Sequence, residues 1–283
     1  MGEFKLPDSA PSHSQHHAES PYSLELKNLE AKFGSRVALQ DLSFRIEPGL
    51  RVAVVGPNGA GKSTLFNVLA GVLPASGGRV LVHGHDPSQH VCIAYVTQSH
   101  QVDWSFPVTV REVVMMGRVG MLGLLRRPAK ADWQRVGESL ELVKLNNLAH
   151  RQIGELSGGQ KQRMFIARAL AQEADLMLMD EPMAGLDVQS QEHVFSVLDD
   201  LRTQGVTVLF ATHDLTLAST QFDRMLLLNR RLVAYGRPAE VLTAENLSAA
   251  YGGLVQTVET DQGPVLVGDI GGHHEHTEEG PHG

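Results

Sequence analysis

The run Gly56 to Ser63 has the residue types and the spacing that bind a polyphosphate. It reads Gly-Pro-Asn-Gly-Ala-Gly-Lys-Ser, and its three glycines let the backbone curl so that successive N–H groups point inward. Lys62 is expected to neutralise the β- and γ-phosphates, the hydroxyl of Ser63 to ligate Mg²⁺, and Thr64 to support the α-phosphate side. The predicted nucleotide cradle consists of Gly56, Pro57, Asn58, Gly59, Ala60, Gly61, Lys62, Ser63 and Thr64.

Two acids, Asp180 and Glu181, follow a short apolar run at 176–179. We expect this run to be a strand beside the phosphate-loop strand, with Asp180 holding the Mg²⁺ shell and Glu181 directing the attacking water. The alternative is a pair of solvated acids that starts a turn before Pro182. The phosphate loop in the same chain favours the catalytic interpretation.

A second glycine turn, Ser157-Gly158-Gly159-Gln160, lies downstream of the phosphate loop and opens a helix. Its backbone N–H groups form a separate set of phosphate-seeking donors. One nucleotide needs only the first loop. The second turn is therefore expected to serve a nucleotide held by another subunit.

These motifs need an α/β scaffold to position them. Residues 51–55, 176–179 and 206–211 are short apolar runs typical of strands that are covered on both faces. Helices are expected at 62–69 and between 188 and 205, and two antiparallel strands between 24 and 46. A largely parallel sheet places its chemistry at the carboxyl ends of its strands, where Gly56, Asp180 and His213 come.

The motif set resembles that of the nucleotide-binding subunit of an ABC transporter. The resemblance rests on LSGGQ at 156–160, GPNGAGKST at 56–64 and LMLMDEP at 176–182, with Gln98 and His213 in the right order, and it covers roughly 23–252. It implies a P-loop NTPase (RecA-like) core with a parallel sheet, an N-terminal antiparallel β subdomain and an inserted α-helical signature subdomain. ATP and Mg²⁺ are the implied substrate and cofactor.

The resemblance also implies individual roles. Gln98 would be the switch glutamine that touches Mg²⁺ and water, and His213 the γ-phosphate sensor. Asp187 would lie in a loop that crosses a dimer interface, and Phe33 would stack on adenine where Tyr is commoner. A core position for Phe33 is the open alternative. In this family a head-to-tail homodimer sandwiches two ATP, with Ser157, Gly158, Gly159 and Gln160 of one subunit closing over the γ-phosphate of the other.

Residues 102–128 resemble the subfamily that serves manganese, zinc and chelated-iron importers. This segment is the subdomain edge where a membrane permease is expected to dock, between about Trp104 and Arg127. An apolar surface with a basic rim would suit a permease loop, whereas plain subdomain core is the alternative, preferred for Val110, Val113 and Val114. The candidate contacts are Trp104, Phe106, Met116, Arg118, Arg126 and Arg127.

The implied location is peripheral, on the cytoplasmic face of the bacterial plasma (inner) membrane, with an extracytoplasmic metal-binding protein as an indirect partner. An iron chelate or another cargo remains an alternative, as does a soluble, non-transport ABC ATPase. A DNA-repair type would carry long heptad arms between the phosphate loop and LSGGQ, and that interval is too short here.

Composition agrees with a soluble α/β protein that binds no nucleic acid. The 283 residues are 42% hydrophobic, and 24 Lys and Arg against 32 Asp and Glu give a formal net charge of −8, which argues against a broad basic face. Cys92 is the single cysteine, so no disulfide framework or thiolate cluster is expected. No apolar run approaches the length needed to span a bilayer, so a membrane role requires a partner.

Three regions are expected along the chain. Residues 1–22 form a disordered His, Ser and Pro-rich tail, 23–255 the ATPase domain with its helical subdomain at about 99–170, and 256–283 a C-terminal extension with a second His-rich tail. The tails either ligate Zn²⁺ or a related ion or remain solvated. Their candidate ligands are His13, His16, His17, His273, His274, Glu275, His276, Glu278, Glu279 and His282.

Overall fold

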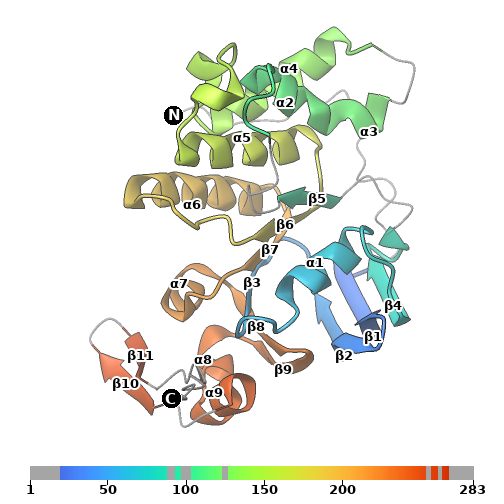
Figure 1. Cartoon of the computed structure of the whole chain (residues 1–283), viewed down its shortest axis with the longest axis vertical. Coiled ribbons are helices and arrows are strands. Elements are labelled where there is room, and N and C mark those ends of the chain that lie inside the picture. Colours follow the sequence, from blue (N-terminus) through green and yellow to red (C-terminus); the bar gives the residue numbers. More distant parts are fainter. Residues whose placement is uncertain are drawn as a thin grey trace, which may run out of the picture.

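The computed structural model describes residues 20–87, 93–96, 103–122, 127–252, 256–260 and 263–267. Its centre is a six-stranded sheet with the order β5-β6-β7-β3-β8-β9, in which every neighbouring pair is parallel except β8 and β9. This confirms the expected α/β class (Figure 1). The strands are β3 (Arg51–Val55), β5 (Ile93–Val96), β6 (Leu176–Asp180), β7 (Thr207–Ala211), β8 (Arg224–Asn229) and β9 (Arg231–Gly236).

Three of the inner strands are buried along their whole length. Every residue of β3, β6 and β7 is buried, as expected for apolar runs that are covered on both faces. All three strands end at polar or glycine residues, so the candidate chemistry gathers at one edge of the sheet.

The expected neighbourhood of Asp180 is wrong in one respect. Strand β6 does not lie beside β3, because β7 pairs with both and separates them. After β6 the chain crosses over through helix α6 (Val188–Thr203) and returns as β7 in the intervening position. Sequence patterns identify parallel strands but do not fix their order in the sheet.

A second sheet, of three antiparallel strands, forms the N-terminal subdomain. Its order is β2-β1-β4, from β1 (Leu24–Phe33), β2 (Arg36–Ile46) and β4 (Gly77–Val82). It lies against the side of the main sheet that carries helix α1 (Lys62–Leu69), as Figure 1 shows. The expected antiparallel β subdomain is confirmed.

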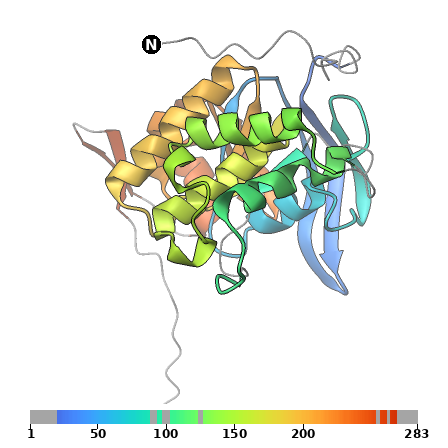
Figure 2. The ribbon, with the colours of Figure 1, turned by 90° about the horizontal axis from the view of Figure 1, so that it is seen from above.

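The helices between β5 and β6 form a layer of their own, at the top of Figure 1 and in front in Figure 2. They are α2 (Val110–Met115), a 3₁₀ turn (Met116–Arg118), α3 (Val119–Leu122), α4 (Lys130–Leu142), two further 3₁₀ turns (Asn146–Leu148 and Ile153–Glu155) and α5 (Gly158–Ala171). The remaining elements are α7 (Leu215–Gln221), α8 (Pro238–Val241), α9 (Ala244–Tyr251) and the hairpin β10 (Gln256–Thr260) and β11 (Gly263–Val267).

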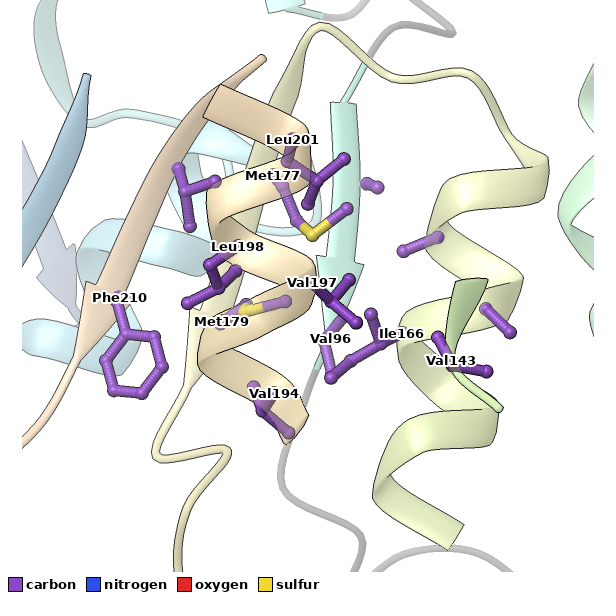
Figure 3. Close-up of a cluster of buried hydrophobic side chains, with 14 of the residues drawn as sticks. Val96, Val143, Ile166, Met177, Met179, Val194, Val197, Leu198, Leu201 and Phe210 are labelled. Carbon is purple, nitrogen blue, oxygen red and sulfur yellow. The ribbon is translucent and has the colours of Figure 1, made fainter. Parts of the chain in front are cut away.

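Two hydrophobic cores cover the two faces of the main sheet. Because side chains alternate along a strand, Val54, Leu178 and Leu209 face the core shared with α1 and the antiparallel subdomain. Met179 and Phe210 face the other core, with α6 and the helical layer. Figure 3 shows Val194, Val197, Leu198 and Leu201 of α6 and Ile166 of α5 in that second core. The expected helix after Val188 is confirmed, and it gives way to Gly205, which has φ 78°.

Candidate active site

The phosphate loop joins the end of β3 to the start of α1, and two of its glycines are sterically required. A Cβ at Gly56 would collide with the carbonyl oxygen of Leu228. Gly61, the N-cap of α1, has φ 99°, and a Cβ there would come within 2.6 Å of Leu39. The loop is therefore pressed closely against β8 and β2, and only glycine fits at both points.

Lys62 lies inside this loop. Its Nζ donates to the carbonyl oxygens of Gly56 (2.8 Å) and Pro57 (3.3 Å), and the residue is only 7% exposed. Burial lowers the pKa of Lys62, while the nearby carboxylates of Glu181 and Asp180 act in the opposite direction. Within the described part of the chain the hydrogen bonds of this buried cation go to carbonyl oxygens, an arrangement that fits an incoming anion such as a phosphate.

Asp180 reaches the phosphate loop although its strand is not adjacent. The residue is 6% exposed, and its carboxylate accepts a hydrogen bond from the side chain of Ser63. Burial raises the pKa of Asp180, and the negative charge of Glu181 adds to this, against the Ser63 hydrogen bond and the charge of Lys62. A hydroxyl and a buried carboxylate side by side are ligands that Mg²⁺ prefers, so the donor set fits that ion.

Glu181 and His213 lie together at the carboxyl ends of β6 and β7. Glu181 has φ 46°, and its backbone N–H donates to the carbonyl of Ala211 (3.1 Å). His213 Nδ1 lies 3.7 Å from Glu181 Oε1, and the imidazole is 73% exposed. The strands therefore bring an acid and an imidazole together beside the phosphate loop.

The loop forms one wall of a cavity of about 370 Å³. Phe33 is among the lining residues and is 52% exposed, so it is not a core residue. Lys62 and Glu181 line the same cavity. The described residues that line the cavity are Phe33, Arg36, Val37, Ala38, Asn58, Gly59, Ala60, Gly61, Lys62, Ser63, Thr64, Glu181 and Arg230.

The second glycine turn starts helix α5, with Ser157 and Gly158 exposed and Gly159 and Gln160 half-buried. Ser157 is its N-cap, with Oγ accepting from the N–H of Gln160 (3.4 Å), while Gln160 Oε1 accepts from the N–H of Ser157 (3.0 Å). This reciprocal pair is a capping box, which fixes the first turn of the helix. None of residues 156–160 is among the described residues that line the cavity.

Asp187 caps the next helix. Its carboxylate accepts from the backbone N–H of Ser190 (2.8 Å) at the start of α6, and this hydrogen bond is the main cause that lowers the pKa of Asp187. Ser190 also lies against Gly159, where a Cβ would come within 2.5 Å of the Ser190 hydroxyl. The Asp187 turn and the second glycine turn therefore pack together within one chain.

Several of the predicted residues lie outside the described part of the chain. Gln98 follows β5, which pairs with β6, but the structure does not describe Gln98 itself. Cys92 and the histidine-rich tails are also outside the described residues.

The subdomain edge divides into core and surface. Val110, Val113 and Val114 are buried, as preferred from the sequence. Phe106 is 58% exposed and Met116 47%. The exposed apolar positions therefore surround the short helix α2.

Trp104 is half-buried on helix α5. Its ring contacts Phe165 edge-on at 5.8 Å between centroids, and Lys161 Nζ lies 4.1 Å from its centroid. Trp104 was expected to be either a permease contact or part of the subdomain core. These contacts show that most of its side chain packs within the subdomain.

The expected basic rim is wrong at Arg118. Its guanidinium is 12% exposed and pairs with Asp132 (3.2 Å) and Glu173 (2.7 Å). These acids belong to α4 and to the turn after α5, so Arg118 ties the two helices together. Arg127 is exposed, and Arg126 lies outside the described residues.

Sequence reasoning missed two cations of the cavity, Arg36 and Arg230. Arg36 follows Phe33 across a hairpin turn, and this proximity was a usable signal. Arg230 comes from the β8–β9 turn, which no motif connects with the phosphate loop.

Comparison with known proteins gives consistent matches. The sequence model of the ABC transporter family matches residues 39–184. The chain is 43% identical over 233 residues to the manganese transport system ATP-binding protein MntB of Bacillus subtilis (strain 168), covering 82% of this chain and 93% of that protein. It is 43% identical over 237 residues to the zinc transport system ATP-binding protein TroB of Treponema pallidum (strain Nichols), covering 83% and 89%.

The fold has solved relatives. An ATP-binding cassette of an ABC transporter, solved in its ADP conformation, superposes with a TM-score of 0.72 at 29% identity, covering 83% of this chain and all of that one (100%). Among the residues that the structure describes, no helix combines the length and the apolar character needed to cross a membrane.

Proposed function

The chain belongs to the ABC transporter family as an ATP-binding subunit, and from this premise we propose that it hydrolyses ATP to power uptake of a divalent metal, manganese or zinc, through a membrane permease. The proposal is supported by the phosphate-loop cavity with its acids and by the cargo in the names of the relatives.

We assign the cavity to one ATP. In this assignment Phe33 provides an exposed aromatic face for adenine, and the phosphate loop, with Lys62 and Thr64 in the cavity lining, binds the phosphates. Ser63 and Asp180, with Gln98, would hold Mg²⁺, which neutralises charge on the phosphate oxygens when bound. Glu181 would then orient water and accept its proton, and His213 would contact the γ-phosphate.

One observation supports the proposed dimer of two copies of this chain. The turn at 157–160 is a partly exposed, capped helix start, yet no residue of 156–160 lines the cavity of its own chain. A helix N-terminus that favours anions but lies outside the cavity of its own chain is suited to a ligand held by another copy. Head-to-tail packing of two copies would place this turn over the γ-phosphate end of the partner's cavity, and Asp187 beside it.

Such a dimer works as a two-state clamp. ATP stabilises the closed dimer through contacts to the γ-phosphate, and these contacts are lost when that phosphate leaves. Hydrolysis therefore resets the clamp, and the permease uses the difference between the two states.

The exposed apolar positions at Phe106 and Met116 are the proposed docking surface for the permease, with Val119 (58% exposed) as a third. Arg127 contributes the basic side of this surface. Docking there would hold the chain at the cytoplasmic face of the bacterial plasma membrane as a peripheral subunit. An extracytoplasmic metal-binding protein would deliver the cargo from the other side.

The experiment for the catalytic assignment is Glu181→Gln. We expect ATP binding to persist and steady-state turnover to fall by roughly 10²-fold or more. Light scattering should detect a dimer with ATP and a monomer with ADP. Undiminished turnover would remove Glu181 from the role, and a monomer in saturating ATP would contradict the clamp.

The cargo is tested by uptake in cells that lack the chain. Restoring the wild-type chain should restore accumulation of radioactive manganese or zinc, and restoring the Glu181→Gln chain should not. Restored uptake of an iron chelate alone would replace the metal assignment with that cargo.

A further inference from the structure

Two arginines that belong to no nucleotide-binding motif line the cavity. Arg36 is the first residue of β2, and Arg230 lies in the turn between β8 and β9. Both side chains are exposed, and no ion pair is recorded for either one among the residues that the structure describes. Two cations without a described acidic partner at the wall of a ligand cavity require an explanation.

Arg36 stands directly opposite Phe33. The two residues are register partners across the β1–β2 hairpin, and side chains of register partners project from the same face of a sheet. Phe33 and Arg36 therefore share a face of the hairpin, and both line the cavity.

Arg230 is fixed next to the loop by its backbone. Its N–H donates to the carbonyl of Ala60 (2.8 Å), and its own carbonyl accepts from the N–H of Gln40 (2.7 Å). Its φ of 56° lies in the left-handed region, which glycine adopts readily and arginine rarely. The following Arg231, in contrast, donates its Nε to Gln40 Oε1 (3.1 Å) and does not line the cavity.

The charge of the lining favours an anion between Phe33 and the loop. Three cations, Arg36, Lys62 and Arg230, line the cavity with one acid, Glu181. This local excess of positive charge occurs in a chain of net charge −8. Lys62 and Glu181 are assigned to the γ-phosphate and the attacking water, so the other two cations remain for the rest of the nucleotide.

We propose that Arg36 and Arg230 bind the α- and β-phosphates of the nucleotide and set the affinity for ADP as well as for ATP. Guanidinium groups are suited to this task because their N–H groups match phosphate oxygens in pairs. The inference rests on the proposed nucleotide site, and it adds residues to that site from outside the family motifs.

The test is calorimetric titration of the full-length chain with ADP and Mg²⁺. Arg230→Gly keeps the left-handed backbone and both backbone hydrogen bonds and removes only the side chain. Arg36→Gln keeps an exposed polar residue at the start of β2. We expect each change to weaken ADP binding roughly three- to tenfold, and the double variant to weaken it further.

Three comparisons make the result specific. Arg231→Gln, the adjacent arginine outside the cavity, should bind ADP as the wild type does. Arg230→Lys, which retains the charge, should recover part of the affinity lost in Arg230→Gly. Raising the salt concentration should weaken the wild type more than the double variant, because screening acts on the charges that the variant lacks.

The outcomes separate this inference from the proposed function. Equal loss of ADP and ATP affinity supports contacts to the α- and β-phosphates. Loss of ATP affinity alone, or unchanged ADP affinity in the double variant, overturns the inference while the nucleotide site stands. A lower melting temperature of Arg230→Gly with no lysine rescue would also overturn it, since the residue would then act only on the fold. A wild-type chain that binds neither nucleotide would overturn the proposed function itself.

Discussion

The second glycine turn offers the sharpest test of the shared site, through Ser157. Replacing Ser157 with Arg removes the hydroxyl that caps helix α5 and places a long side chain where the partner's γ-phosphate is expected. Because residues 156–160 do not line the cavity of their own chain, nucleotide binding by a single chain should be spared. Cooperative turnover, which needs the partner's turn, should be abolished.

The cost to the fold can be estimated from the cap. Ser157 accepts one hydrogen bond, from the N–H of Gln160 at 3.4 Å, and loss of an N-cap side chain costs about 1 kcal/mol. For a chain of this size that corresponds to a fall in melting temperature of about 2–4 °C. Thr243 is a matched control, because it caps α9 through one bond from the N–H of Asn246 (3.2 Å) and lies outside the cavity lining.

The assay compares Ser157→Arg, Ser157→Ala and Thr243→Ala. All three should lose a similar amount of stability in thermal unfolding, and all should bind ADP like the wild type. ATP turnover should fall by roughly 10²-fold or more in Ser157→Arg, by less in Ser157→Ala, and not in Thr243→Ala. Full turnover in Ser157→Arg, or loss of ADP binding in the isolated chain, would refute the reasoning.

Three further changes test the scaffold. Gly56→Ala forces the phosphate loop away from Leu228 and should weaken ADP binding at least about tenfold. Its control is Gly137→Ala, inside α4 with open space around it, which should keep ADP binding and gain up to about 1 kcal/mol of stability. Equal ADP affinities in the two variants would contradict the packing argument. Phe210→Ala empties a fully buried site beside Phe222 (5.0 Å between centroids) and should cost about 3–5 kcal/mol in urea unfolding, so a loss under about 1 kcal/mol would mean that the core collapses freely. Burial raises the pKa of Tyr235 to about 12, so its neutral phenol stabilises the fold fully below about pH 10 and this stability is lost as the pH rises toward 12. Between pH 8 and pH 12 the wild type should therefore lose up to about 2–3 kcal/mol more than Tyr235→Phe, and parallel curves would remove Tyr235 from this role.

The sequence predicts the elements better than their arrangement. The apolar run at 51–55 and the glycine loop after it give β3 and α1 with the expected bounds, because burial on both faces and glycine conformations leave direct marks on residue type. Strand order leaves no such mark. Neither Asp180 nor the residues of β7 indicate that β7 lies between β6 and β3, since that order depends on how the whole crossover packs.

The same limit applies within the site. The motifs predicted Lys62, Ser63 and Asp180. In the structure Lys62 donates to a carbonyl of the phosphate loop, and Asp180 accepts a hydrogen bond from Ser63. Arg230 was not predicted because a backbone hydrogen bond to Ala60 places it beside the phosphate loop, and backbone bonds of this kind are independent of residue type. The prediction for Arg118 was wrong because the sequence does not distinguish an exposed arginine at a subdomain edge from one in a buried ion pair. The distinction depends on Asp132 and Glu173, whose positions come from the fold.

Strand β7 is bonded at its carboxyl end to both halves of the site. The N–H of Thr212 donates to the carbonyl of Val54, just before the phosphate loop, and the carbonyl of Ala211 accepts from the N–H of Glu181. The phosphate loop and Glu181, the proposed general base, are therefore both positioned by backbone hydrogen bonds to the end of β7. Ala211 is fully buried, so a larger side chain in its place would displace both the phosphate loop and Glu181. Nucleotide binding and ATP hydrolysis should therefore be lost together when this strand is disturbed.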